Sequence, residues 1–313
     1  MIRIIYKSAI AVLGCGIAGG CKPEPVPFST NDCKRPSSFI SRIGFDPSRT
    51  YFSTSDSRVM GLQLIQAADL QHPDASVSKV YQDSSWKRAG WLAAMQTDAN
   101  GNLFVAPAPF INLLNNNPRQ RNTLYRVDGT SGDLRPFVQL PVPDGVPDQQ
   151  AFGIIGLAYL CEADQLYVST VAGSDRQHIR GKVYRIQAST GKIEESLNGI
   201  DAMGLGITYV TGERLLLIGN GRNSSVMAVK LNAQGAFEGK PYEIFSLEGQ
   251  GPRGDDKVRR IRTQQDGSLL VYGMEFNFNL IAPHEKQEGK YWFVFDETDR
   301  KWLFKSGLPS GGK

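Results

Sequence analysis

Four cysteines and three histidines are the residues of this sequence best suited to covalent or metal chemistry. They are Cys15, Cys21, Cys33, Cys161, His72, His178 and His284. No two cysteines form a CxxC pair, so a zinc site built from Cys and His is not predicted. His178, His284 and Glu275 would hold a metal only if the fold gathered them, and surface histidines are the better interpretation. We expect no metal and no cofactor.

Cys21 ends a segment with the features of an export signal. Arg3 and Lys7 precede an uncharged, mostly apolar run over 8–20, which is too short to cross a bilayer comfortably. The tetrapeptide AGGC that ends at Cys21 resembles the lipobox of bacterial lipoproteins, whose cysteine thiol accepts diacylglycerol. The VLGC that ends at Cys15 is a rival site, but it would leave a very short apolar run.

The lipobox resemblance implies a division of the chain. Residues 1–20 would be the signal peptide, and 21–37 a lipidated cysteine (diacylglycerol and palmitate-type acyl chains) with a Pro- and Ser-rich tether. In the lipoprotein family, Lys22 after the cysteine resembles outer-membrane sorting in Gram-negative bacteria. An uncleaved anchor and an ordinary signal peptide are the alternatives.

Cys33 and Cys161 are left over from the export signal. An oxidising envelope compartment permits a disulfide between them, and two unpaired thiols are the equal alternative. If bonded, they would join the end of the tether to the body of the protein.

The elements that position the remaining residues repeat along the chain. A strand, a polar turn and a second strand recur five times, beginning at Arg42, Met95, Ala158, Thr208 and Ile261. The turns are rich in Gly, Asn and Asp, the residues that tolerate hairpin geometry. Their centres are Pro47-Ser48, Asn100-Gly101, Ala163-Asp164, Thr211-Gly212 and Asp266-Gly267.

A second hairpin completes each unit. Its first strand begins at Ser57, Asn122, Gly181, Ser224 or Gly289, and alternating apolar residues such as those of LYRV and VYRI indicate one buried face. Four strands per unit and no long amphipathic helix predict an all-β fold, a β-propeller of four-stranded antiparallel blades. We expect five blades over 38–308, with six as the alternative, and a C-terminal tail over 309–313.

The repeats resemble several propeller families. GNLFVA followed by NTLYRVDGTSGDL is similar to NHL-repeat and streptogramin-lyase-like propellers and to the regucalcin/gluconolactonase superfamily. The turns at Ser131-Gly132 and Thr190-Gly191 resemble those of PQQ-type repeats. The resemblance lies mainly in the strand-turn-strand pattern, so it implies the fold rather than a function.

Long connections between the second and third strands of the blades should meet on one face. Loops on a rigid scaffold commonly carry binding sites, and arginines beside aromatics suit protein or glycan contacts. The alternative is that the arginines are solvated and the phenylalanines hold their own loops down. The candidate binding residues are Phe110, Arg119, Arg121, Arg176, His178, Arg180, Arg222, Phe276, Asn277 and Phe278.

An enzyme finds less support in the sequence. Gluconolactonase-like propellers hold a divalent cation with Glu, Asn and Asp, and Ile155 stands where that pattern has Asn. The chain contains no GxSxG, Walker or HExxH motif, so no catalytic residue is predicted. A net charge of +4 is too small to indicate nucleic acid. We expect an envelope lipoprotein that binds or scaffolds a protein or glycan, with a metal-dependent lactonase or lyase-like enzyme as the alternative.

Overall fold

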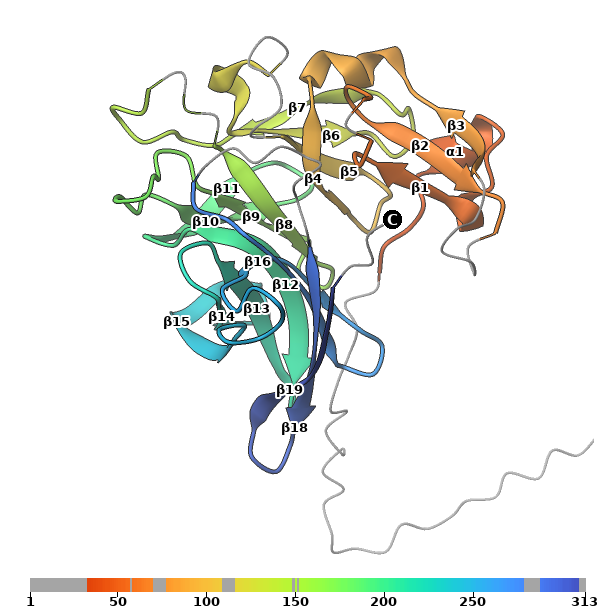
Figure 1. Cartoon of the computed structure of the whole chain (residues 1–313). Helices are drawn as coiled ribbons and strands as arrows, with labels where there is room; N and C mark the ends of the chain where they lie inside the picture. Colours follow the sequence, from red (N-terminus) through yellow and green to blue (C-terminus); the bar gives the residue numbers. More distant parts are fainter. Residues whose placement is uncertain are drawn as a thin grey trace, which may run out of the picture.

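The protein is an all-β, five-bladed propeller (Figure 1). The computed structural model describes residues 33–56, 58–69, 77–108, 116–147, 150, 152–278 and 288–309. Five antiparallel sheets follow one another along the chain, and each is built only from consecutive strands. Cys21 and Phe110, together with the signal segment, lie outside the described residues.

Each blade is numbered in chain order, and its strands run from the propeller axis outward. Blade 1 contains β1 (Thr50–Ser53), β2 (Gln63–Ala67) and β3 (Val77–Tyr81). Blade 2 contains β4 (Leu92–Thr97), β5 (Leu103–Pro107), β6 (Thr123–Val127) and β7 (Leu134–Gln139). Blade 3 contains β8 (Ile154–Leu160), β9 (Gln165–Thr170), β10 (Lys182–Gln187) and β11 (Ile193–Asn198).

Blades 4 and 5 complete the ring. Blade 4 contains β12 (Ala202–Val210), β13 (Glu213–Asn220), β14 (Ser225–Leu231) and β15 (Phe237–Ser246). Blade 5 contains β16 (Lys257–Thr263), β17 (Leu269–Met274), β18 (Gly289–Asp296) and β19 (Lys301–Pro309). The helical segments are short: α1 (Ser38–Arg42) and the 3-10 turns η1 (Pro47–Arg49), η2 (Ser84–Ala89) and η3 (Pro118–Gln120).

The predicted hairpin turns are confirmed in blades 2 to 5. Gly101, Asp164, Thr211 and Gly267 all adopt positive φ, between 48° and 79°. Gly and Asp reach this left-handed region readily, whereas Thr211 pays a steric penalty and is followed by Gly212 at φ 80°.

Blade 1 differs from the prediction. The segment from Arg42 is not a strand, because α1 ends there and Pro47-Ser48 belong to η1. Asp46 caps η1 by accepting the Ser48 N–H at 3.0 Å, and Pro47 occupies the first position of the turn. Local capping chemistry therefore overrides the hairpin pattern. The strand expected from Ser57 begins instead at Gln63, and β3 was not predicted.

Four apolar clusters join neighbouring blades, and each of these draws its side chains mainly from two facing sheets. They connect blades 1 and 2, 2 and 3, 3 and 4, and 4 and 5. A fifth cluster joins blades 3, 4 and 5 through Phe152, Val171, Met203, Met274 and Phe276. Within the described residues no cluster connects blade 5 to blade 1. We call the boundary between blades 5 and 1 the seam. Members that the four clusters draw from neighbouring sheets include Leu64 with Tyr125, Phe104 with Leu166, Leu160 with Leu216, and Phe245 with Phe293.

A disulfide fixes the start of the described chain. Cys33 bonds to Cys161, which follows β8, with their Cα atoms 5.9 Å apart. Ser37, which is buried, donates its hydroxyl to the Gly101 carbonyl at 2.5 Å. Residues 33–37 were expected to be tether but belong to the body. They lie at the end of blades 2 and 3 that carries the short hairpin turns, which we call the tight-turn end. No helix among the described residues is long and apolar enough to span a membrane.

Candidate functional site

A wide axial pocket lies where the five blades meet. Its volume is about 1390 Å³, and it is lined by the inner strands β1, β4, β8, β12 and β16. This exceeds the range of roughly 300–1,000 Å³ that is usual for small-ligand sites, so the pocket can take a ligand larger than a monosaccharide. The side chains of these five strands decide what the pocket can bind.

The wall formed by β8 and β12 is small and apolar. Gly156 and Leu157 lie on β8, and Gly204 to Ile207 lie on β12. A Cβ on Gly204 would come within 2.8 Å of the Arg259 backbone, so glycine is needed for the close approach of β12 and β16. Packing therefore explains the glycines of this wall, and they form no phosphate-binding loop.

The wall formed by β16 is cationic. Arg259, Arg260 and Arg262 all line the pocket. Arg259 and Arg260 share one carboxylate, Glu288, at 2.9 and 3.1 Å. Both arginines remain about two-fifths exposed, at 44% and 42% of their side chains. The wall thus keeps accessible positive charge beside its ion pair.

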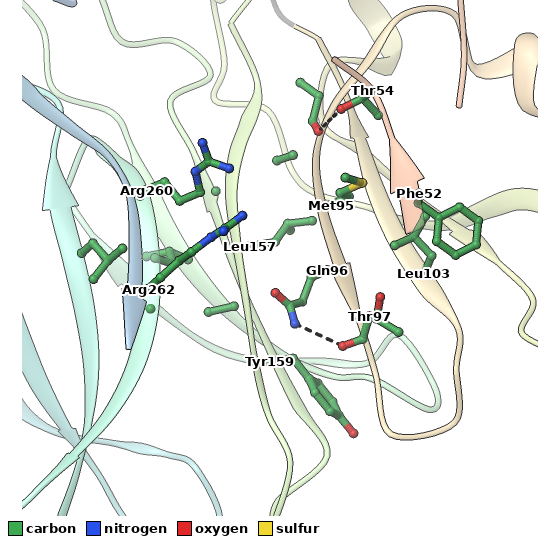
Figure 2. Close-up of a pocket in the computed structure, with 18 of the residues that line it drawn as sticks. Phe52, Thr54, Met95, Gln96, Thr97, Leu103, Leu157, Tyr159, Arg260 and Arg262 are labelled. Carbon is green, nitrogen blue, oxygen red and sulfur yellow. Dashed lines mark hydrogen bonds between the residues drawn. The ribbon is translucent and has the colours of Figure 1, made fainter. Parts of the chain in front are cut away.

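Arg262 differs from its neighbours. No described carboxylate forms an ion pair with it, and its guanidinium lies 5.6 Å from the Tyr272 ring, over which Arg260 also stacks at 4.2 Å. A shared ring holds the two guanidiniums side by side without using their N–H donors. Figure 2 shows both reaching from β16 towards β8 and the far wall.

The far wall, formed by β1 and β4, is neutral and polar. The Gln96 amide donates to the Thr97 carbonyl at 3.1 Å, and the Thr54 hydroxyl donates to the Ala93 carbonyl at 3.0 Å (Figure 2). On the neighbouring strand β8, burial and a hydrogen bond to Asp164 raise the pKa of Tyr159, so this phenol stays protonated and cannot act as a base near neutral pH. The far wall supplies amide and hydroxyl groups rather than acid–base groups.

Charge distinguishes the pocket from the rest of the surface. Its described lining holds five cationic side chains and one carboxylate, Glu288; the cations are Lys34, Arg35, Arg259, Arg260 and Arg262. A concave site lined by charge of one sign focuses its field and attracts counter-charged ligands. Among the described residues no three His, Cys, Asp or Glu side chains lie together as a metal site.

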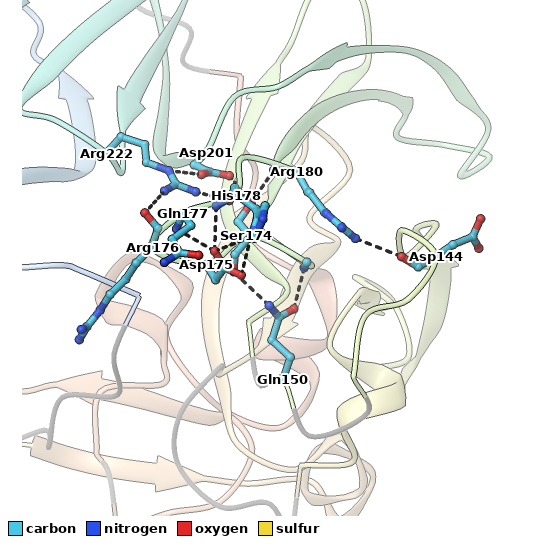
Figure 3. A network of polar contacts seen from close by, with 11 residues as sticks. Asp144, Gln150, Ser174, Asp175, Arg176, Gln177, His178, Arg180, Asp201 and Arg222 are labelled. Carbon is cyan, nitrogen blue, oxygen red and sulfur yellow. Dashed lines mark hydrogen bonds and ion pairs between the residues drawn. The ribbon is translucent and has the colours of Figure 1, made fainter.

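The long-loop face brings together four of the candidate binding residues: Arg176, His178, Arg180 and Arg222 (Figure 3). Arg222 donates to the buried Asp201 carboxylate at 2.5 Å and to the carbonyls of Arg176 and His178. Its guanidinium also stacks 4.3 Å over the Phe278 ring. Arg222 therefore orders three loops with the same donors that a ligand would use.

The remaining candidates also make internal contacts. Arg121 is only 6% exposed and donates to the carbonyls of Pro147 and Gln150. Phe276 is buried and packs edge-on against Phe152, with ring centroids 5.8 Å apart. Several other groups do remain on the surface of this face. These are Arg119, Arg176, His178 and Asn277, of which Asn277 accepts from Arg176 through its carbonyl at 3.2 Å.

His178 pairs with Asp175 at the tip of this network. Hydrogen bonds from the His178 ring and from the backbone N–H groups of Gln177 and His178 lower the pKa of Asp175 to about 2. The carboxylate closes the turn by satisfying these donors. His284, the proposed metal partner of His178, lies outside the described residues.

The sequence reasoning identified the loop arginines but passed over the pocket arginines. Arg259, Arg260 and Arg262 were not among the candidate binding residues. A signal was present, because arginine recurs at 260 and 262, at the start of the first strand of the fifth unit, and alternate residues of a strand share a face. Inner strands line the axis of a propeller, so this pattern indicates a charged pocket.

Comparison with known proteins supports the fold. No known protein-family model matches the sequence, and no curated protein is significantly similar to it. A luciferin-regenerating enzyme has a TM-score of 0.50 at 11% identity, with 83% of this chain and 72% of that chain covered. At this identity the similarity shows the propeller fold alone.

Two further examples among the solved structures to which this chain is similar come from Bacteroides species. The extracellular domain of a protein described as a hybrid two-component system of B. thetaiotaomicron has a TM-score of 0.43 at 15% identity, over 69% of this chain. This chain covers only 24% of that one. A structure described as a 6-phosphogluconolactonase of Bacteroides uniformis has a TM-score of 0.45 at 12% identity, with 82% of this chain and 66% of that chain covered.

Proposed function

We propose that this protein is a lipid-anchored binding propeller of the bacterial envelope that holds an acidic glycan in its axial pocket. The cationic β16 wall is the observation that carries the proposal. Arg260 and Arg262 present guanidinium groups, which bind carboxylates in bidentate fashion, to a cavity whose described lining has one carboxylate.

The other walls favour a sugar rather than a simple ion. Gln96, Thr54 and Thr97 place amide and hydroxyl groups opposite the arginines, where they suit the hydroxyls of a glycan. Tyr51, which is 46% exposed at the pocket edge, offers a ring face for stacking. A ligand with several hydroxyls and a carboxylate matches both walls.

The proposed test uses an acidic and a neutral oligosaccharide of equal length, oligogalacturonate and a cello-oligosaccharide, with calorimetry as the measurement. Oligogalacturonate should bind, more weakly as salt is raised, and the neutral glycan should not. Replacing both Arg260→Gln and Arg262→Gln should weaken binding about ten-fold or more, as expected for loss of charge-assisted hydrogen bonds.

A matched control separates site from surface charge. Arg135→Gln removes an exposed arginine from the outer strand β7 and should leave affinity unchanged. A phosphorylated sugar tests the other source of anionic groups. Tighter binding of that sugar would move the ligand class from uronates to phosphates. Equal binding of the neutral glycan would contradict the proposal.

Membrane anchoring is the second part of the proposal. The apolar segment that ends in AGGC supports lipidation of Cys21, with the outer membrane as the expected location. Replacing Cys21→Ser should release the protein from the membrane fraction or stall its processing, as followed by cell fractionation and mass spectrometry. Unchanged membrane association and mass in this variant would contradict a lipoprotein.

The long-loop face remains a proposed contact surface for an envelope protein or glycan. Exposed Arg119, Arg176 and His178 support it, since Arg121 and Arg222 serve the loops themselves. The metal-dependent lactonase has less support from the geometry, because the described residues do not assemble a carboxylate cluster on the axis.

A further inference from the structure

Blade 1 is the incomplete member of the propeller. Its sheet has three strands within the described residues, in the order β1-β2-β3, whereas each of the other four sheets has four. In blades 2 to 5 an outermost strand pairs along the full third strand. The outer edge of β3 is the corresponding place in blade 1.

The exposure of β3 reflects this difference. Four of its five residues, Val77 to Val80, are exposed, and Val77 and Val80 reach 54% and 51%. The third strands of the other blades, β6, β10, β14 and β18, have at most one exposed residue each. Two exposed valines on a strand of high β-propensity are expected where no strand of the described residues covers the edge.

The backbone of β3 is also unsatisfied on its outer side. Its pairing partner is β2, and no other described backbone hydrogen bond involves residues 77–81. On the face of the sheet, Val80 continues a row with Ile65 and Tyr51 that ends at this edge. Free N–H and C=O groups beside apolar side chains form a template for another strand.

Lys79 does not protect the edge in the usual manner. Its ammonium turns back along the sheet, where it donates to the Gly44 carbonyl at 2.7 Å and lies 4.3 Å from the Phe45 ring. No described carboxylate forms an ion pair with it. A strand paired with β3 would therefore gain from an Asp or Glu opposite Lys79.

A second copy of the chain fits this edge poorly. Two β3 strands in antiparallel overlap would place Lys79 opposite Lys79, and like charges directly opposite are destabilising.

The pairing of β2 with β3 contains a bulge at Ser78. This bulge is no obstacle to the addition of a strand, since every pairing of a third with a fourth strand in blades 2 to 5 also contains a register shift.

We propose that β3 accepts an extended segment of another envelope protein as the fourth strand of blade 1. Its apolar side chains would lie beside Val77 and Val80, and a carboxylate would lie opposite Lys79. This site is separate from the axial pocket, so glycan binding and strand binding fail or succeed independently.

The test uses a short synthetic peptide of alternating valine and threonine with one central glutamate. We expect the peptide to bind and to slow hydrogen exchange at the amides of 77–81 by about ten-fold or more, because these amides become hydrogen-bonded. Two N-methylated versions of the peptide distinguish strand pairing from non-specific hydrophobic binding. Methylation on the peptide edge that faces β3 should abolish binding, and methylation on the opposite edge should not.

Variants of the protein provide the second arm. Val77→Lys with Val80→Lys should reduce peptide affinity about ten-fold or more, as charged edges block strand addition. Tyr242→Lys is the matched control, since Tyr242 is 44% exposed on the outer strand of a complete blade. It should bind the peptide like the parent protein.

Three results would overturn the proposal. Slow exchange at 77–81 in the free monomer would mean that the chain covers its own edge. A dimer in sedimentation that Val80→Lys dissociates would mean that a second copy is the occupant. Peptide binding that survives either edge methylation would mean that the backbone of β3 is not the acceptor.

Discussion

Arginines occupy two regions of this propeller, and they do different things there. On the long-loop face, Arg222 uses its donors on Asp201 and on the carbonyls of two loop residues. In the axial pocket, Arg262 stacks near Tyr272 and has no ion pair among the described residues. The position of an arginine in a cleft therefore does not show whether it can bind a ligand. The hydrogen bonds that it already makes within the protein decide this. Arg262 keeps its guanidinium donors for a ligand, whereas Arg222 uses its donors within the protein.

Burial explains the division. The Asp201 side chain is fully buried and accepts from the Ser174 hydroxyl at 2.5 Å and the Gly181 N–H at 3.0 Å, in addition to Arg222. A buried carboxylate needs such partners, because its desolvation is otherwise uncompensated. Arg262 is exposed and no carboxylate of the described residues forms an ion pair with it, so we expect the fold to depend on it much less.

The largest expected effect is therefore on stability. Arg222→Ala should lower the free energy of unfolding by about 3–5 kcal/mol, the usual loss when one partner of a buried ion pair is removed. Arg262→Ala should change it by less than about 0.5 kcal/mol, as for a surface substitution. Urea unfolding of both variants measures the difference. Equal losses of unfolding free energy in the two variants would contradict the distinction between the two regions.

The disulfide gives the next largest effect and sharpens the comparison. Replacing Cys33→Ser and Cys161→Ser opens a link between residues 128 apart, which should cost about 2–4 kcal/mol. The link lies at the tight-turn end, away from Arg222. Combined with Arg222→Ala, the two losses should add within about 0.5 kcal/mol, as for independent sites. Strong non-additivity in urea unfolding would show that the two ends are coupled.

A smaller effect concerns acid. The pKa of Asp175 is about 2 in the folded protein, below its ordinary value of 3.8, because His178 and two backbone N–H groups bond to the carboxylate. Its stabilising contribution is therefore complete above pH 3.8 and is lost as pH falls through about 2. The amides of Gln177 and His178, followed by NMR, should titrate near that pH.

The control for the acid titration is Asp175→Asn, which should remove the transition from both amides. A transition near pH 4 instead of 2 would mean that the His178 bond is absent in solution.

Much of the fold could be predicted from the sequence because hairpins leave local signals. Gly101 and Gly267 mark turns whose geometry demands positive φ, and the strands beside them alternate as expected. Blade 1 lacked these signals. Asp46 and Pro47 have the chemistry of a helical cap, and the three-strand sheet depends on which edges are covered, a property of the assembled molecule.

The site was harder to predict than the fold. Arg121 and Arg222 are in loops, where arginine is usually solvated. Only the structure shows that Arg121 donates to a backbone carbonyl and that Arg222 donates to the Asp201 carboxylate. The Cys33–Cys161 bond could be proposed but not decided, because spacing alone does not bring two cysteines within 5.9 Å.

The seam between blades 5 and 1 gives this ring two ends, much as in a linear stack. Each sheet contains only consecutive strands, and four described apolar clusters link each blade to its neighbour in sequence. A fifth cluster joins residues of blades 3, 4 and 5 at the long-loop face. In such an array, stability is close to a sum of nearest-neighbour terms, and unfolding can begin at either end. The disulfide between Cys33 and Cys161 links the N-terminal end of the described chain to blade 3, and no described disulfide links the C-terminal end. Fraying should therefore start at the outer strands β18 and β19 of blade 5, which the fifth cluster does not include. During synthesis each blade can dock on the one before it without waiting for the C-terminus.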